Sequence, residues 1–292
     1  MKYITTTLFL CCYFFSVAQT ERKPIKTRQY IPLSAWKKIY KKPLTKQDSM
    51  NFVIKDQDTL VMLTSVPRPN GVFVPYEYKD STFLSYYTKI AFRLKNDSTD
   101  KKQTMKYWKQ PLRVFITGSF SGKVERDFKK FARSTINHID SLQIKFVNKV
   151  EDSNFIIYSH EDYDYESKIN KKNNSAYYMH WSKSNKITKF AMRINTSHYF
   201  SDKLRLMEIK RYFIESLGYF KLIDEFSCDS YFSLCNSKEK RLTSLDIELL
   251  KYHYSYGICK GTDLHTFLDQ HKKAKEMLRL NPKNKMNFIH PE

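Results

Sequence analysis

The sequence predicts an α+β domain, and three observations lead to this prediction. Apolar residues recur at three- and four-residue steps over about 124–142 and again over 202–217, which is typical of amphipathic helices. Short runs rich in Val, Ile and Phe, such as Leu112–Ile116, alternate with these segments as strands would. The 292 residues are 41% hydrophobic and 15% aromatic. That composition supplies a core for one large domain, or for a domain with an extension.

Residues 1–18 have the pattern of a secretion signal. Lys2 provides the charged end, residues 8–15 are an apolar run, and Ser16-Val17-Ala18 is a small-residue cleavage site. The apolar run is too short to span a bilayer, and no second run of membrane length follows it. We therefore expect an exported protein, periplasmic or extracellular, whose mature chain has no transmembrane segment.

Two small regions are expected before the main domain. Residues 19–50 are basic, contain Pro24, Pro32 and Pro43, and indicate an extended arm with a short helix near Ala35–Tyr40. Residues 51–103 are expected to form a small β-rich element that ends in the polar break Asn96–Gln103. Its expected strands are 52–54, 60–63, 72–74, 83–87 and 90–94, with a turn at 67–71.

The main domain is expected over 104–258 and alternates strands with helices. A strand at 112–116 precedes the first long helix, and a second long helix at 202–217 closes the series. Between them we expect strands at 144–147 and 154–158 and a hairpin of 176–179 with 186–194. Thr243 and Asp246 have capping-box spacing and begin a further helix. Residues 259–292 complete the chain with a helix at 263–280 and a loose tail of about a dozen residues.

The stretch Arg211–Tyr219 resembles the active-site helix of metzincin-type zinc proteases, H-E-x-x-H-x-x-G-x-x-H, with its zinc chemistry removed. The downstream order also resembles a matrixin, since Ser230-Tyr231-Phe232 stands where Ser-Ile-Met would lie. Leu242–Tyr254 then stands for the helix that follows. The resemblance covers about 108–254 and implies a zincin-like twisted mixed sheet with two long helices. An ordinary amphipathic helix that ends in Leu-Gly is the alternative.

Aligned on Gly218, the resemblance implies that Arg211, Glu215 and Lys221 stand at the three zinc-ligand positions and Tyr212 at the general-base position. Arg and Lys offer no lone pair to a metal at neutral pH, and one carboxylate does not hold a protein zinc. We expect no metal and no other cofactor. Arg211 and Glu215 are four residues apart and would form an ion pair on one helical face.

The same segment resembles an uncharacterised family of secreted bacterial domains that lacks the zinc-binding histidines. In that family the helix is followed by S-I-F and then by L-T-x-L-D. Tyr212 and Glu215 depart from the family's Glu and Gln. The residues that fit are Arg211, Leu217, Gly218, Ser230, Phe232, Leu242, Thr243, Leu245 and Asp246.

Charge and composition narrow the classes of partner. The formal net charge is +21, which favours an anionic partner: membrane head groups, wall polymers, acidic polysaccharide or extracellular nucleic acid. The lysines are spread along the chain without one tract, so a generally basic surface is the alternative. Six glycines and the absence of G-x-G-x-x-G, P-loop and G-x-S-x-G strings argue against nucleotide-binding and serine-hydrolase chemistry. Specific nucleic-acid binding is not predicted.

Cysteines outside the signal are Cys228, Cys235 and Cys259. Export permits a disulfide. Cys228 and Cys235 flank the turn at 230–232 and could close that loop with a disulfide, in which case Cys259 would have no cysteine partner.

Three functional hypotheses follow. The first is a non-catalytic binding or structural protein of the bacterial envelope, with a degenerate-site cluster of Arg211, Tyr212, Glu215, Gly218, Lys221 and Phe232. The second is a divergent secreted hydrolase. It would use a metal held by His160, His180 or His198, or Glu215 with Tyr212 as catalytic residues, or Glu208 with Glu215 as a carboxylate pair; Arg211 between those two favours simple pairing. The third is an adaptor that recruits another envelope protein through its C-terminal helix.

Overall fold

The computed structural model describes residues 30–40, 43–50, 52–55, 57–62, 72–94, 103–169, 174–237, 239–280 and 287–290. The predicted secretion signal, the arm before residue 30, the turn at 67–71 and most of the break at 96–103 lie outside these ranges. The chain divides into two compact units, Met1–Asn70 and Gly71–Glu292. Among the described residues, no helix has both the length and the apolar character needed to cross a membrane.

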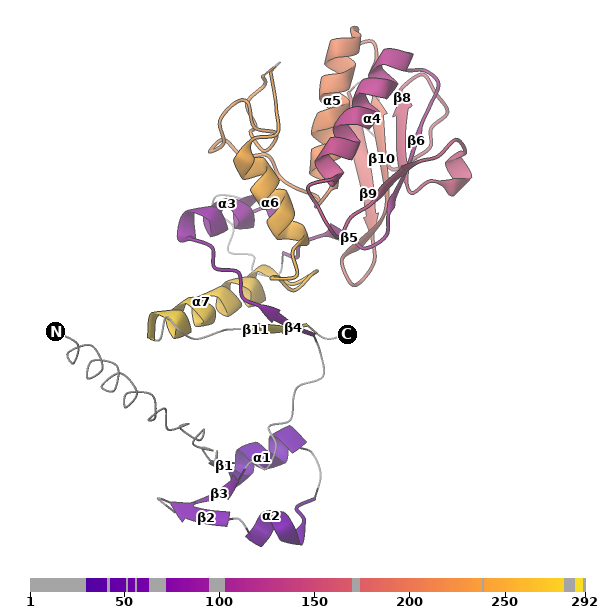
Figure 1. Ribbon diagram of the computed structural model, residues 1–292. Coiled ribbons are helices and arrows are strands. Elements are labelled where there is room, and N and C mark those ends of the chain that lie inside the picture. Colours follow the sequence, from indigo (N-terminus) through magenta and orange to yellow (C-terminus); the bar gives the residue numbers. More distant parts are fainter. Residues whose placement is uncertain are drawn as a thin grey trace, which may run out of the picture. The chain divides into compact units, whose positions relative to one another are not determined.

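The first unit is a small antiparallel sheet with two short helices (Figure 1). Its strands β1 (Tyr30–Pro32), β2 (Phe52–Lys55) and β3 (Asp58–Met62) lie in the order β1-β3-β2. The helices are α1 (Leu33–Tyr40) and α2 (Lys46–Met50). Trp36 and Val61 are the buried apolar side chains among its described residues. The sequence predicts residues 30–40 and 43–50 in an extended arm with a short helix near 35–40. The short helix is present as α1, but these residues pack against β3 and are not an extended arm.

The second unit is built on a six-stranded, mostly parallel sheet. Strands β6 (Leu112–Ile116), β7 (Ile144–Phe146), β8 (Phe155–Ser159) and β10 (Lys186–Ile194) run parallel in the order β10-β8-β6-β7. The short strand β5 (Tyr107–Trp108) pairs in parallel with the start of β10. Strand β9 (Ala176–Trp181) pairs antiparallel with β10, as the predicted hairpin requires. The sequence prediction of an α+β fold is confirmed at this level.

Helices α4 (Gly122–Ile136) and α5 (Asp202–Ser216) lie side by side on one face of this sheet (Figure 1). Each begins with a serine cap, since the hydroxyl of Ser121 accepts from Val124 N and that of Ser201 from Leu204 N. Phe128 and Phe213 meet edge to face between the helices with ring centroids 5.4 Å apart, and both are fully buried. The order of elements from β6 to α5 is the one the sequence predicts.

The sequence prediction of strands between residues 83 and 94 is wrong. Residues 83–87 and 90–94, expected as strands, lie largely in the helix α3 (Ser81–Ala91). The carboxylate of Asp80 accepts from Phe83 N at 2.8 Å and begins the helix. The buried residues of α3, Phe83, Leu84, Tyr87, Thr88, Ile90 and Ala91, follow a helical period. Aromatic and β-branched residues gave this segment the composition of a strand.

Helices α3, α6 (Ser244–Tyr254) and α7 (Leu264–Leu280) are joined by two buried histidines. His253 Nε2 lies 2.9 Å from the carbonyl of Lys106, so this nitrogen carries the proton, and Nδ1 accepts from the Tyr87 hydroxyl at 3.0 Å. His271 bonds the hydroxyls of Tyr76 and Tyr252 at 3.0 and 2.9 Å. Burial lowers the pKa of His253 to about 3 and that of His271 to about 4, so both rings are neutral at pH 7.

The end of the chain is part of a sheet. Strand β11 (Asn287–His290) pairs antiparallel with β4 (Val72–Pro75), which opens the second unit. Residues 287–290, expected in a loose tail, are therefore ordered by a partner that is remote in the sequence.

Candidate functional site

The C-terminal half of α5 carries the residues that the sequence singles out. Ile209 and Phe213 fix one face of this half in the core, and Leu217 caps its end. The other face carries charged side chains, which are themselves sheltered. Glu208 and Glu215 are buried at 3% and 7% exposure, and only the Arg211 side chain between them reaches solvent to any extent, at 26%.

Arg211 binds both carboxylates. Its Nε donates to Glu208 Oε2 at 2.9 Å and its Nη2 to Glu208 Oε1 at 2.5 Å. Its Nη1 donates to Glu215 Oε1 at 2.8 Å, so the predicted i,i+4 ion pair is present in the structure. A guanidinium has five donors in a fixed plane, which lets one side chain hold two carboxylates that stand about two helical turns apart, one on each side of it.

Two tyrosines enclose this ion cluster. The Tyr177 hydroxyl, from β9, donates to Glu215 Oε2 at 2.9 Å. The Tyr212 hydroxyl donates to the carbonyl of Ser175 at 2.8 Å, and the two rings meet edge to face at 5.0 Å. Burial raises the pKa of both phenols, and the neighbouring carboxylates raise it further. Neither phenol is placed to act as a base near neutral pH.

Glu215 is held as a structural group. Burial raises the pKa of its carboxyl, while the charge of Arg211 and the hydroxyl of Tyr177 act in the opposite direction. One of its oxygens accepts from Arg211 and the other from Tyr177. This arrangement occupies the carboxylate that a metal-free hydrolase would need.

Gly218 and Lys221 lie just beyond α5. A Cβ at Gly218 would lie 2.4 Å from the ring of Phe220 and 2.8 Å from His253 Nε2, so only glycine fits there. Lys221 Nζ donates to the carbonyl of Leu94 at 2.7 Å. Its backbone N–H donates to the carbonyl of Ile90 at 2.9 Å. The hydrogen bonds of Lys221 are thus with the end of α3 and the segment after it, and not with Arg211 or Glu215.

A second cation stands close to this corner. Arg93 and Tyr219 both have positive φ, 53° and 55°. The Arg93 guanidinium lies 4.0 Å from the centroid of the Tyr219 ring and donates to the carbonyls of Tyr219 and Phe220. It also acts on the pKa of Glu215 in the same direction as Arg211. Sequence reasoning missed Arg93, because nothing near residue 93 indicates contacts with residues 219 and 220.

The turn Ser230–Phe232 is held by hydrogen bonds to Asp246 of α6. The buried carboxylate of Asp246 accepts from Ser230 Oγ at 2.6 Å, from Tyr231 N at 3.0 Å and from Thr243 N at 3.2 Å. Phe232 is fully buried and packs edge to face on Phe220 at 5.2 Å. Thr243 and Asp246 form the predicted capping box, so one carboxylate both begins a helix and orders the turn.

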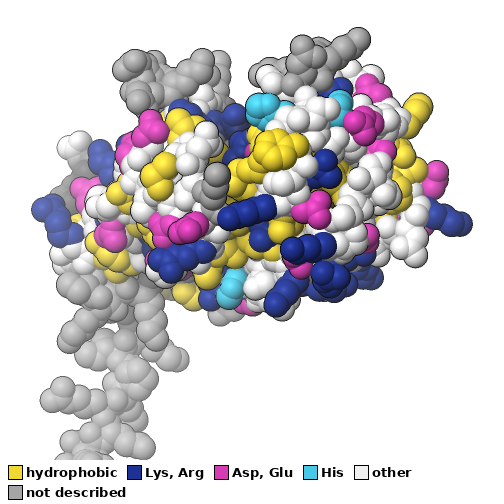
Figure 2. All heavy atoms as spheres, turned by 90° about the horizontal axis from the view of Figure 1, so that it is seen from above, with side chains coloured by type: hydrophobic (Ala, Val, Ile, Leu, Met, Phe, Trp, Pro, Cys, Tyr) yellow, Lys and Arg dark blue, Asp and Glu magenta, His cyan; other side chains and the backbone are white. Residues whose placement is uncertain are grey.

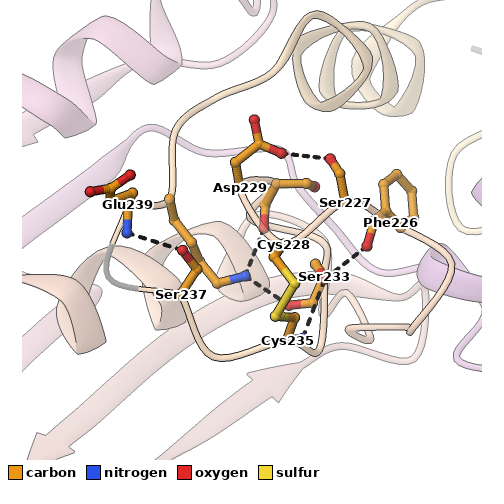
Figure 3. The surroundings of a disulfide bond; sticks show 10 residues. Phe226, Ser227, Cys228, Asp229, Ser233, Cys235, Ser237 and Glu239 are labelled. Carbon is orange, nitrogen blue, oxygen red and sulfur yellow. Dashed lines mark hydrogen bonds between the residues drawn. A yellow bond between two sulfur atoms is a disulfide. The ribbon is translucent and has the colours of Figure 1, made fainter.

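Cys228 and Cys235 are joined in a disulfide across this turn (Figure 3). Ser233 Oγ donates to the carbonyl of Phe226 at 3.0 Å, and Lys240 Nζ donates to the carbonyls of Ser230 and Ser233 at 2.7 and 2.9 Å. Cys259 is a free thiol. The loop is therefore held both by a covalent bond and by buried polar contacts.

The three histidines predicted as possible metal ligands each contact different residues and share no hydrogen-bond partner. His160 bonds Thr196 and Ser197, and His180 Nε2 lies 2.7 Å from a Glu166 oxygen. The His198 ring meets that of Tyr199 edge to face, with centroids 5.0 Å apart. Within the described ranges, no three His, Cys, Asp or Glu side chains are grouped to hold a metal ion. Arg211, Glu215 and Lys221, which the resemblance to zinc proteases aligns with ligand positions, are not a set that suits zinc.

Comparison with known proteins adds one finding. Residues 80–213 match the family model of a protein of unknown function (DUF2927). The match begins at the cap of α3 and ends within α5. The chain is thus similar to an uncharacterised domain over this range. No curated protein and no solved structure matches it.

Proposed function

We propose that the second unit is a zincin-like scaffold that has lost its zinc ligands and serves as a non-catalytic binding domain. The strand order β7-β6-β8-β10-β9, with β9 antiparallel at the edge and both long helices on one face, supports this scaffold. So does the turn at 230–232, which lies beyond the helix in the chain order of that class of protein.

The observation that carries the proposal is the Arg211 cluster. Arg211 stands at the first ligand position, and its guanidinium binds a carboxylate on each side. A cation held between two buried carboxylates provides the charge that a metal would otherwise supply. Because both carboxylates are paired with this guanidinium, neither is left as an uncompensated anion that would attract a metal ion.

We propose that the partner is an anionic polymer of the bacterial envelope, reached after export. The net charge of +21 supports this, and basic side chains are spread over the face shown in Figure 2. Recruitment of another envelope protein through α7 is the competing role. The observation that would favour this competing role is a stable protein complex that high salt does not dissociate.

Elemental analysis of the purified mature chain, residues 19–292, tests the non-catalytic role. We expect less than about a tenth of an equivalent of bound metal, with or without added zinc, because the ligand positions are cationic or paired. A stoichiometric metal that survives dialysis would contradict the proposal and favour a divergent metal-dependent hydrolase.

Restoring histidines tests the scaffold separately. The variant Arg211→His/Glu215→His/Lys221→His should bind one zinc at least 10-fold more tightly than Arg126→His/Lys130→His, a two-histidine control with the same i,i+4 spacing on α4. Equal affinity would show that residue 221 does not approach the other two positions, and the zincin-like alignment would be wrong.

A further inference from the structure

The outward face of α4 carries a stripe of cations. Lys123, Arg126, Lys130 and Arg133 follow one another at three- and four-residue steps, so they project from one side of the helix. All four are exposed, and the Arg126 side chain is 71% accessible. At a rise of 1.5 Å per residue the stripe extends over about 15 Å.

A shallow trough of about 650 Å³ runs along this face. Its lining includes the cationic residues Arg126, Lys129, Lys130 and Arg133 and the carboxylate of Glu125. Ser134 and Asn137 continue it toward the end of the helix and add a hydroxyl and an amide. The trough is open rather than enclosed, so an extended chain could lie along it.

Few carboxylates neutralise the trough. Lys129 Nζ pairs with Glu125, and Arg126 has a long contact of 3.8 Å with Asp127. Among the described residues no carboxylate lies within salt-bridge distance of Lys130 or Arg133. These two charges and much of the Arg126 charge are therefore available to an anionic partner.

We propose that this trough binds a linear acidic polysaccharide. Its carboxylates would pair with Arg126, Lys130 and Arg133, and its hydroxyl groups would bond the polar side chains of Ser134 and Asn137. This inference rests on the proposed binding function and gives it a location and a ligand class.

Two other polyanions fit this face less well. Single-stranded nucleic acid needs exposed aromatic rings for base stacking. The neighbouring rings are already covered by cations: Lys129 and Arg133 lie over Phe146 at 5.3 and 5.1 Å, and Lys210 lies over Phe131 at 4.9 Å. A lipid surface would favour exposed apolar anchors, and the trough lining contains none.

Titration of the mature chain with polygalacturonate oligosaccharides, followed by calorimetry at 50 and 200 mM salt, tests the proposal. Arg126→Gln/Lys130→Gln/Arg133→Gln should weaken binding at least 10-fold. The matched control Lys272→Gln/Lys273→Gln/Arg279→Gln removes the same charge from the exposed face of α7 and should weaken it less than 2-fold. Neutral dextran should not bind.

Each outcome decides a separate point. Equal losses in the two variants would show that net charge alone drives binding and would overturn the α4 site, while the proposed function would stand. If the unaltered protein bound none of the three polyanions (polygalacturonate, a single-stranded oligonucleotide and anionic vesicles), the proposed function would be overturned as well. Tighter binding of the oligonucleotide or the vesicles, lost in the α4 variant, would overturn the ligand class.

Discussion

Arg211 and Glu215 lie one turn apart on α5 and are joined by a hydrogen bond of 2.8 Å between Nη1 and Oε1. The same guanidinium holds Glu208, so a single cation compensates two carboxylates that are almost fully buried. The stability of this corner of the second unit should therefore depend on one side chain.

Replacing Arg211 with Met should lower the free energy of unfolding by about 3 kcal/mol, because two buried carboxylates lose their counter-ion. Urea denaturation at pH 7.5 measures the change. The variant Arg211→Met/Glu208→Gln/Glu215→Gln should recover most of the loss, since it leaves no buried charge. Arg126→Met, at an exposed site, should change the free energy by less than about 0.5 kcal/mol. A comparable loss in Arg126→Met would contradict the assignment.

Gly218→Ala should destabilise the second unit by roughly 1–3 kcal/mol, the usual cost of overpacking a core. The added methyl would overlap the ring of Phe220, which is fully buried and packs against the rings of Phe232 and His253. Thermal unfolding of Gly218→Ala and Gly118→Ala makes the comparison, because no atom lies within 4 Å of a Cβ built at Gly118. An unchanged melting temperature for Gly218→Ala would mean that residues 218–220 adopt another backbone.

Stability should fall as the pH is lowered from about 6.5 to 5. His253 and His271 have pKa values of about 3 and 4 in the folded state, against 6.5 when unfolded. Below pH 6.5 these two histidines bind protons in the unfolded chain but stay neutral in the folded chain. The free energy of unfolding is thus unaffected by these histidines above pH 6.5. It decreases as the pH falls toward their folded pKa values, by up to about 1.4 kcal/mol per pH unit for each histidine.

Urea titrations across this window check the pH dependence, and they stay above the range in which ordinary carboxylates titrate. His253→Gln should reduce the slope against pH by about half, whereas His265→Gln, on the exposed side of α7, should leave it unchanged. The same slope in all three proteins would show that the buried histidines do not control it.

Reducing the disulfide should lower the free energy of unfolding by about 2.5 kcal/mol at 25 °C, the chain-entropy estimate for a loop of about eight residues. Cys228 and Cys235 are separated by seven positions, so the constraint on the unfolded chain is small. Lys240 and Asp246 continue to hold the turn. Dithiothreitol should lower the urea midpoint of the native protein but not that of Cys228→Ser/Cys235→Ser. A shift in the double variant would mean that the reductant acts elsewhere.

What the sequence predicts correctly here is mostly local. The Arg211–Glu215 pair follows from helical spacing, and the Thr243–Asp246 capping box follows from a four-residue pattern. The pairing of Cys228 with Cys235 needs only a short loop. In each case the two partners lie within one turn or one loop of the chain.

The features that escaped prediction depend on distant partners or on competing local signals. Arg93 acts through Tyr219 and Phe220, and Lys221 through Leu94, so neither contact has a local pattern. For α3 the aromatic composition favours a strand, and the helix cap at Asp80 is the signal that indicates the correct structure.

The pairing of β4 with β11 has a consequence for how the second unit folds. Strand β4 opens this unit, and its partner is made only after the sheet, the two long helices and α7 have all been synthesised. Closing so long a loop is slow relative to local contacts. Until then both edges of β4 lack a partner strand, and other extended chains could join the edge that β11 later takes. The nascent protein would therefore benefit from a chaperone that covers residues 72–75 until the last strand arrives.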